Sequence, residues 1–307
     1  MTDTSTAEGE KTRPAADRGG PGTPAARRWP RSRHGTRPDV VPVRHWGRTA
    51  GAVVVVLVLL GMLYGLATNP NLKWSVVGEY LFNGDVLNGL LQTLEMTVVA
   101  MVFALALAVV IGVMRTSQSK VISGFAAGWV FLFRGVPLIV LLIFIGNLGL
   151  FFKKITVGIP FTSLDLWSAP VGSVVTPFVA SVIGLAAAGS GYMAEIVRAG
   201  LLSVGRGQHE AAKALGLDTG RTLRHVVLPQ ALRIIIPPLG NEFIGMLKAS
   251  AIVSVIAGGD LLTVTQGLSS VNFRTIEMLM VATIWYLLVI VVYSVAQFYL
   301  ERRTAER

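Results

Sequence analysis

The 307-residue sequence contains no cysteine, which excludes disulfides, thiolate metal sites and cysteine nucleophiles. Its four histidines are scattered, and no H-E-x-x-H or similar metal-ligand spacing occurs, so we expect no metal site. No G-x-x-x-x-G-K-[ST] sequence is present, so we expect no P-loop for ATP in this chain. Charged residues make up only 14% of the chain, against roughly 25% in a typical soluble domain. This scarcity of charge argues against a freely soluble enzyme and predicts an integral membrane protein.

Apolar residues make up 52% of the chain and gather in long runs. Because about 20 helical residues span a bilayer core, each run is long enough for one membrane span. The runs are continuously apolar rather than alternating, which is typical of helices and not of barrel strands. The sequence therefore predicts an all-α, polytopic membrane protein with about six transmembrane helices. Their apolar runs cover residues 51–68, 96–114, 121–152, 166–194, 234–257 and 278–300.

The first 48 residues differ from the rest of the chain. They hold ten Lys or Arg, five Asp or Glu, six Pro and six Gly, with almost no apolar clustering. Such a segment cannot bury enough apolar surface to offset its ordering entropy, so we predict a disordered cytoplasmic tail over residues 1–48. This tail is too long for the charged leader of a signal peptide. Residues 49–72 are therefore predicted to form an additional, uncleaved N-terminal transmembrane helix.

The distribution of positive charge predicts the orientation. With a cytoplasmic N-terminus, the cytoplasmic segments hold 21 of the 27 Lys and Arg residues, and the outer segments hold only Lys73, Lys153, Lys154 and Arg274. The positive-inside rule then places both termini in the cytoplasm of a multi-pass protein of the cell membrane. The net charge of +10 is explained by this asymmetry, so we expect the lipid bilayer and no nucleic acid as a partner.

The longest predicted cytoplasmic loop, residues 198–233, reads as structured. Gly205 and Gly207 break the preceding helix, and residues 208–215 (QHEAAKAL) are good helix formers. Gly216 stands where a helix C-terminal glycine belongs, and Asp218 or Thr219 can cap a second short helix through Val227. Pro229 then suits the first turn of the next span. The small residues of the first helix fit either a groove in a soluble partner or the membrane surface.

The residues of this loop resemble a known family motif. They match the E-A-A-x3-G-x9-I-x-L-P loop of ABC importer permeases, with a conservative valine in place of isoleucine. The matching positions are Glu210, Ala211, Ala212, Gly216, Val226, Leu228 and Pro229.

Neighbouring segments resemble the polar amino-acid permeases of the histidine, glutamine and glutamate type. Residues 133–137 (FRGVP) are similar to their F-R-G-T-P segment. Residues 191–200 are similar to their A-Y-x-A-E-x-x-R-x-G segment, with Gly191 in place of alanine. Residues 237–248 are similar to their P-P-L-G-N-x-F-x-x-x-x-K stretch. The resemblance covers about residues 88–302, the predicted five-helix permease domain.

The resemblance implies a permease subunit that is not itself an enzyme. It implies two cytoplasmic ATPase subunits on the loop, a second permease subunit, identical or sister, and an extracytoplasmic substrate-binding protein. ATP and Mg would be bound by the ATPase, so this chain is expected to hold no cofactor. The alternative is a self-contained secondary transporter or channel for a small polar solute. Such a protein would show internal repeats with matched broken helices, and the sequence shows no convincing repeat.

Ionisable residues inside predicted spans are candidates for the substrate pathway, because each is costly in a membrane. Glu195 and Arg198 are three residues apart and can pair, either to anchor the helix or to line the pathway or its inner gate. Glu242 and Lys248 are six apart, about 240° around a helix, and cannot pair with each other. Either could face the pathway and meet a charged group of a zwitterionic solute. Arg134 is the fifth candidate for the pathway, although we expect it to bond to freed backbone carbonyls rather than to substrate.

Two proline-containing segments complete the sequence predictions. Pro137 follows Gly135 at a point where a helix is weakened. Pro237 and Pro238 are expected to interrupt the fifth span. Unwound backbone in a membrane is tolerated only where it is buried in protein or lines a cavity, so this interruption would lie beside the pathway.

Overall fold

The computed structural model describes residues 46–158 and 165–305, and the chain divides into two units, residues 1–65 and 66–307. The first unit contains nearly all of helix α1 (Trp46–Ala67), which is long and apolar enough to cross a membrane. Its most apolar stretch is exposed throughout, as expected of a helix surrounded by lipid. The predicted tail lies almost wholly outside the described residues.

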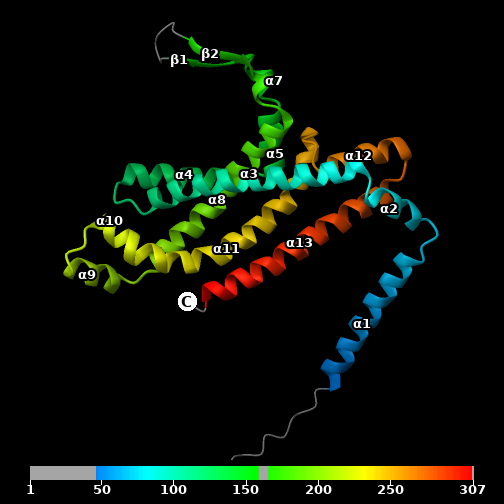
Figure 1. Cartoon of the computed structure of the whole chain (residues 1–307), viewed down its shortest axis with the longest axis horizontal. Coiled ribbons are helices and arrows are strands. Elements are labelled where there is room, and N and C mark those ends of the chain that lie inside the picture. Colours follow the sequence, from blue (N-terminus) through cyan, green and yellow to red (C-terminus); the bar gives the residue numbers. More distant parts are fainter. Residues whose placement is uncertain (1–45, 159–164, 306–307) are drawn as a thin grey trace, which may run out of the picture. The chain divides into compact units, whose positions relative to one another are not determined.

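The second unit is built from helices and one small hairpin (Figure 1). Among the described residues of the whole chain, five helices are long and apolar enough to span a membrane, and the bent pair α4–α5 would make a sixth. The predicted all-α membrane fold is therefore confirmed. The elements before the hairpin are α2 (Trp74–Leu81), α3 (Gly84–Arg115), α4 (Lys120–Gly135), α5 (Leu138–Gly146) and α6 (Leu148–Phe151). The later ones are β1 (Lys154–Gly158), β2 (Asp165–Pro170), α7 (Val171–Val174), α8 (Pro177–Ser203), α9 (Arg206–Ala214), α10 (Thr219–Thr222), the π-helix η1 (Leu223–Val227), α11 (Leu228–Ala249), the 3-10 helix η2 (Ser250–Ile256), α12 (Leu261–Asn272) and α13 (Thr275–Ala305).

Helix α8 is the centre of this unit, packed against α3, α4, α5 and α11. Its contact with α3 depends on small residues spaced four apart, Ala100, Ala104, Ala108 and Gly112, the alanines all fully buried. A Cβ on Gly112 would lie 2.8 Å from the side chain of Val197 in α8. Small residues on one helix face let two backbones approach closely, so this sequence pattern sets the α3–α8 packing.

The predicted span over residues 121–152 is not one straight helix. Helix α4 ends at Gly135, and α5 begins at Leu138 at an angle of 97° to it. Pro137 lacks an N–H and its ring excludes a continuous helix, which accounts for the break. The bend leaves non-helical backbone beside α8.

The predicted span over residues 166–194 begins later than its apolar composition suggested. Residues Asp165–Pro170 form strand β2, which pairs antiparallel with β1. Helix α8 begins only at Pro177, because Thr176 caps it by accepting a hydrogen bond from the Val179 N–H at 3.3 Å.

The predicted interruption at Pro237 and Pro238 is also wrong, because α11 continues through both prolines. Two prolines remove only the hydrogen bonds to the carbonyls of Arg233 and Ile234, and the helix tolerates this loss. The α-helical backbone instead ends after Ala249, where the chain tightens into the 3-10 helix η2.

Candidate functional site

The loop between α8 and α11 contains the two short helices that the sequence predicts. Helix α9 begins at Arg206, with Gly205 at its N-cap, and it packs against η1. Within α9, Ala212 is buried, whereas Glu210 and Ala211 are exposed. Leu215, directly after α9, is 81% exposed, so the exposed side of this helix carries Ala211 and Leu215, which are four residues apart. The outer surface of α9 is left free for a partner.

Gly216 ends α9 in the left-handed conformation that its position predicts, with φ of +77°. The Gly216 N–H bonds the carbonyl of Lys213, and the Leu217 N–H bonds the carbonyl of Ala212, each at 3.0 Å. These two bonds form the Schellman arrangement, which satisfies the last carbonyls of a helix. Asp218 then caps α10 by accepting a hydrogen bond from the Arg221 N–H at 2.8 Å.

The sequence suggested that the second short helix ends before Pro229, but the structure shows no such end. This helix runs through the π-helix η1 into α11, because the Leu228 N–H bonds the carbonyl of Leu223, five residues earlier. This wider turn lets Pro229 follow at the start of α11 without breaking the helix. Val226 is half-buried, whereas Leu228 and Pro229 are exposed.

Gln230 is a structural link that the sequence did not indicate. Its Nε2 donates to the Val226 carbonyl at 2.8 Å and to Oε1 of Gln208 in α9 at 3.4 Å. It therefore ties the exposed helix α9 to the start of α11.

At the loop end of α8, Glu195 forms a three-residue ion cluster. The predicted pair with Arg198 is present, with Nε donating to Oε2 at 2.7 Å. Arg115, at the end of α3, donates from its Nε to Oε1 of Glu195 at 3.3 Å. All three side chains are partly exposed. The cluster thus links two helices as well as anchoring one, and sequence reasoning missed Arg115 because it is 80 residues away.

Arg134 lies at the end of α4, just before the bend. Its guanidinium carbon is 5.1 Å from the centre of the Tyr192 ring, within the range of a cation–π contact. The expected hydrogen bond from Arg134 to a freed backbone carbonyl is not found in the part of the chain that the structure describes.

Tyr192 also separates two cavities. One has a volume of about 570 Å³ and is lined by Arg134, Arg115 and Glu195, and the other is about 180 Å³ and is lined by Glu242. Four of the ionisable residues of this region therefore gather around one tyrosine. Glu242 is half-buried, whereas Lys248 is exposed and lines neither of these cavities.

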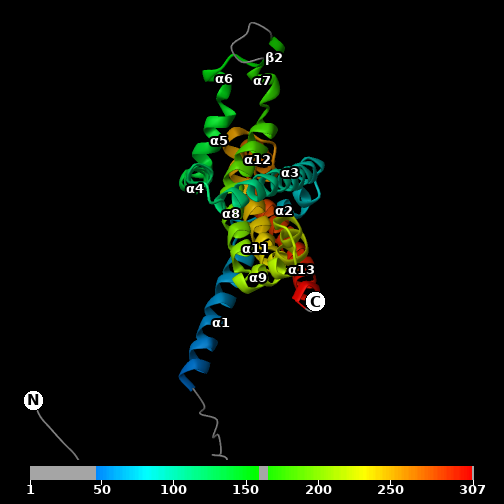
Figure 2. The same cartoon turned by 90° about the vertical axis from the view of Figure 1, so that its left-hand side faces the viewer.

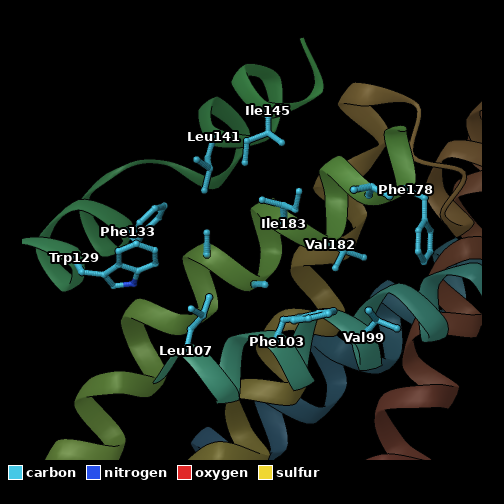
Figure 3. Close-up of a pocket in the computed structure, with 13 residues that line it drawn as sticks. Val99, Phe103, Leu107, Trp129, Phe133, Leu141, Ile145, Phe178, Val182 and Ile183 are labelled. Atoms are coloured by element: carbon cyan, nitrogen blue, oxygen red, sulfur yellow. The ribbon is translucent and has the colours of Figure 1, made fainter. Parts of the chain in front are cut away.

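A third cavity, of about 680 Å³, is lined only by apolar side chains from α3, α4, α5 and α8 (Figure 3). Its α8 residues include Val182, Ile183, Ala186 and Ala187. The α8 residues of the Glu242 cavity, including Leu185, Gly189 and Tyr192, point roughly 140° away at 100° per residue. Helix α8 therefore has an apolar cavity on one face and the ionisable cluster on another, and only the second suits a polar solute.

Residues 104–306 match the family described as binding-protein-dependent transport system inner membrane component. This chain belongs to that family. The permease is 37% identical over 265 residues to the arginine transport system permease protein of Corynebacterium glutamicum, which covers 86% of this chain and 82% of the relative. It is 31% identical over 218 residues to the glutamine transport system permease protein of Escherichia coli K12, which covers 71% of this chain and 92% of the relative.

Solved structures agree with these relatives. The permease resembles a chain of "an amino acid ABC transporter with histidines" at a TM-score of 0.60 and 36% identity, over 71% of this chain and 94% of that one. A methionine ABC transporter shares the fold at a TM-score of 0.55 and 19% identity, over 71% of this chain and 95% of that one. The family predicted from the loop residues is therefore confirmed, and these matches do not favour a self-contained secondary transporter. The permease is the membrane component of a transport system rather than an enzyme.

Gly191 is the position at which the permease departs from the A-Y-x-A-E-x-x-R-x-G segment. A Cβ there would lie 3.2 Å from Cγ of Arg134 and 3.3 Å from Cβ of Phe133. Glycine therefore leaves room for the α4 residues whose arginine reaches Tyr192. This departure was visible in the sequence, but its spatial reason was not.

Proposed function

We propose that this permease is the membrane-spanning subunit of an ATP-driven importer of a polar amino acid. The observation that carries the proposal is the ionisable cluster around Tyr192, inside a protein that otherwise presents apolar surface to the membrane. Charges at such positions are costly and mark solute pathways. The names of the relatives support an amino acid as the solute, with arginine and glutamine as the first candidates and glutamate and histidine as further ones.

The cluster offers both signs of charge to a zwitterion. Arg134 can meet the substrate carboxylate, and Glu242 can meet an ammonium or guanidinium group. Glu195 and Arg198 lie deeper toward the cytoplasmic loop, where they would contribute to an inner gate. Lys248, exposed on α11, would meet the pathway only where a second permease subunit completes it.

The cytoplasmic loop would couple this pathway to ATP hydrolysis. Its exposed helix α9 has the size and position to insert into a groove of a soluble partner. In this proposal, two separate ATPase subunits bind ATP and Mg and push on α9. The motion reaches α11 through Gln208, Gln230 and the continuous helix that starts at Thr219.

Two further partners follow from the same proposal. A second permease, identical or sister, would cover the face that contains the α4–α5 bend, because non-helical backbone and charges are not tolerated against lipid. An extracytoplasmic binding protein would deliver the substrate.

The proposed orientation places both termini and the coupling loop in the cytoplasm. A reporter fused at Gly84 should read outside, and one fused at Gly220 should read inside. If the reporter at Gly220 reads outside, both the proposed orientation and the proposed coupling role of the loop are wrong.

The proposed pathway is tested with the reconstituted complex and labelled amino acids. Glu242→Gln should reduce uptake at least tenfold, about 1.4 kcal/mol or more, while assembly with the ATPase stays intact. The matched control is Glu79→Gln in α2, an exposed glutamate outside the cavities, which should transport normally. Unchanged uptake of all four amino acids by Glu242→Gln would show that this carboxylate does not face the pathway.

A further inference from the structure

The β1–β2 hairpin is amphipathic. In its register Ile155 pairs with Ala169 and Val157 with Trp167, so these four side chains share one face. The alternating pairs place Lys154, Thr156 and Ser168 on the other face, where the two hydroxyls are 3.3 Å apart. Pro170, paired with Lys154, also lies on this second face, and Leu166, at the register shift, is 74% exposed. The hairpin therefore has one apolar face and one mainly polar face.

The outer part of the apolar face is exposed among the residues that the structure describes. Val157 is 54% exposed and Trp167 is 48% exposed, whereas Ile155 and Ala169, nearer the base, are half-buried. Figures 1 and 2 show the hairpin projecting from the helices, far from α9. Burial of these two side chains in an apolar surrounding would be favourable.

Exposed aromatic and apolar side chains also gather in the segment directly before the hairpin. Phe151, in α6, stacks on Phe144 of α5 with ring centroids 6.4 Å apart, and both rings are exposed. Leu150 and Phe152 are exposed beside them. This aromatic group directly follows α5, the second half of the bent helix pair that is apolar enough to span a membrane.

The charges and aromatics fit a lipid headgroup region. Lys153 and Lys154 follow the aromatic group directly, and both are exposed. Tryptophan and other aromatic side chains gather at the membrane–water interface, and lysines there reach toward lipid phosphates. The strands are also short, five and six residues, and the four-residue helices α6 and α7 connect the hairpin to α5 and α8.

We propose that the β1–β2 hairpin lies on the bilayer, with Val157 and Trp167 inserted at the boundary between headgroups and acyl chains and Lys153 and Lys154 at the phosphates. The hairpin then acts as an interfacial anchor. It holds the ends of α5 and α8 at a set membrane depth and so positions the α4–α5 bend. The occupant of its apolar face is lipid, not another protein.

The absence of cysteine in this chain allows a direct test, provided that the other subunits are freed of reactive cysteine. Val157→Cys and Thr156→Cys, from the two faces, are spin-labelled separately in the full complex in lipid nanodiscs. Collision with oxygen, which concentrates in the bilayer, is compared with collision with a water-soluble nickel chelate. The label at 157 should be relaxed mainly by oxygen and the label at 156 mainly by nickel, with no change when the binding protein is added.

A second measurement tests the lysines. Replacing Lys153 and Lys154 with glutamine should raise nickel access at position 157 in anionic bilayers, because each lysine near an anionic surface is worth a factor of about five. In uncharged bilayers the same change should have little effect.

Three results would overturn the proposal. Equal nickel access at positions 156 and 157 would show that the hairpin stands clear of the bilayer. Shielding of position 157 from both reagents would show that protein covers it. If this shielding is the same with and without the binding protein, the covering protein is a second permease copy. Shielding that arises only with the binding protein would assign the face to that partner. None of these outcomes would affect the proposed import function, which is tested by uptake.

Discussion

Replacement of Gly216 tests the coupling loop most directly. Its backbone has φ of +77°, and a Cβ built on it would have no atom within 4 Å apart from its immediate chain neighbours, so no distant part of the permease obstructs it. The cost of Gly216→Val is therefore conformational, roughly 1–2 kcal/mol for a non-glycine residue in the left-handed region. That energy corresponds to a factor of about 5–30 in the population of the intact loop.

We expect Gly216→Val to weaken binding of the ATPase by about this factor and to lower substrate-stimulated ATP hydrolysis and uptake together. Abundance in the membrane should not change, because no span is altered. Gly216→Asn should lose much less, because asparagine tolerates the left-handed conformation. Gly220→Val is the matched control, since a Cβ there makes only an ordinary contact, 3.4 Å from Oδ1 of Asp218.

The assay is the affinity of the solubilised permease for the ATPase, measured beside ATP hydrolysis and uptake in proteoliposomes. If Gly216→Asn is as damaging as Gly216→Val, lack of room at the ATPase surface, not backbone conformation, is the cause. If Gly216→Val behaves like Gly220→Val, this loop is not the coupling element.

Two further predictions concern the helices around Tyr192. Glu195→Gln should lower the melting temperature of the complex more than Arg115→Gln does, because it leaves two arginines facing each other without a carboxylate; equal shifts would show that the cluster contributes nothing as a unit. Gly128→Ala in α4, with open space around its Cβ, should stabilise the permease by up to about 1 kcal/mol. Gly191→Ala should not stabilise the permease and should reduce uptake, since its methyl group would press on Arg134. Equal stabilisation by Gly191→Ala and Gly128→Ala would contradict this account.

The sequence by itself determined the features that depend on local chemistry. Long apolar runs specify spans, because every turn of a membrane helix must satisfy its own backbone and present apolar side chains. The order of residues from Glu210 to Pro229 specified the family, and Gly216 and Asp218 specified a helix end and a helix start through their own backbone and side-chain hydrogen bonds.

The tertiary structure alone decided the features that join distant segments. Apolar content could not separate strand β2 from helix α8, because pairing with β1 assigns residues 165–170 to the hairpin. Local rules predicted a break at both proline sites, yet the chain bends only at Pro137, whereas α11 loses two hydrogen bonds at Pro237 and Pro238 and stays continuous. The contacts of Arg115 with Glu195, and of Arg134 with Tyr192, arise from helices that meet only in three dimensions. Such contacts depend on which faces of α3, α4 and α8 pack together, and no local pattern in one segment encodes the face of another.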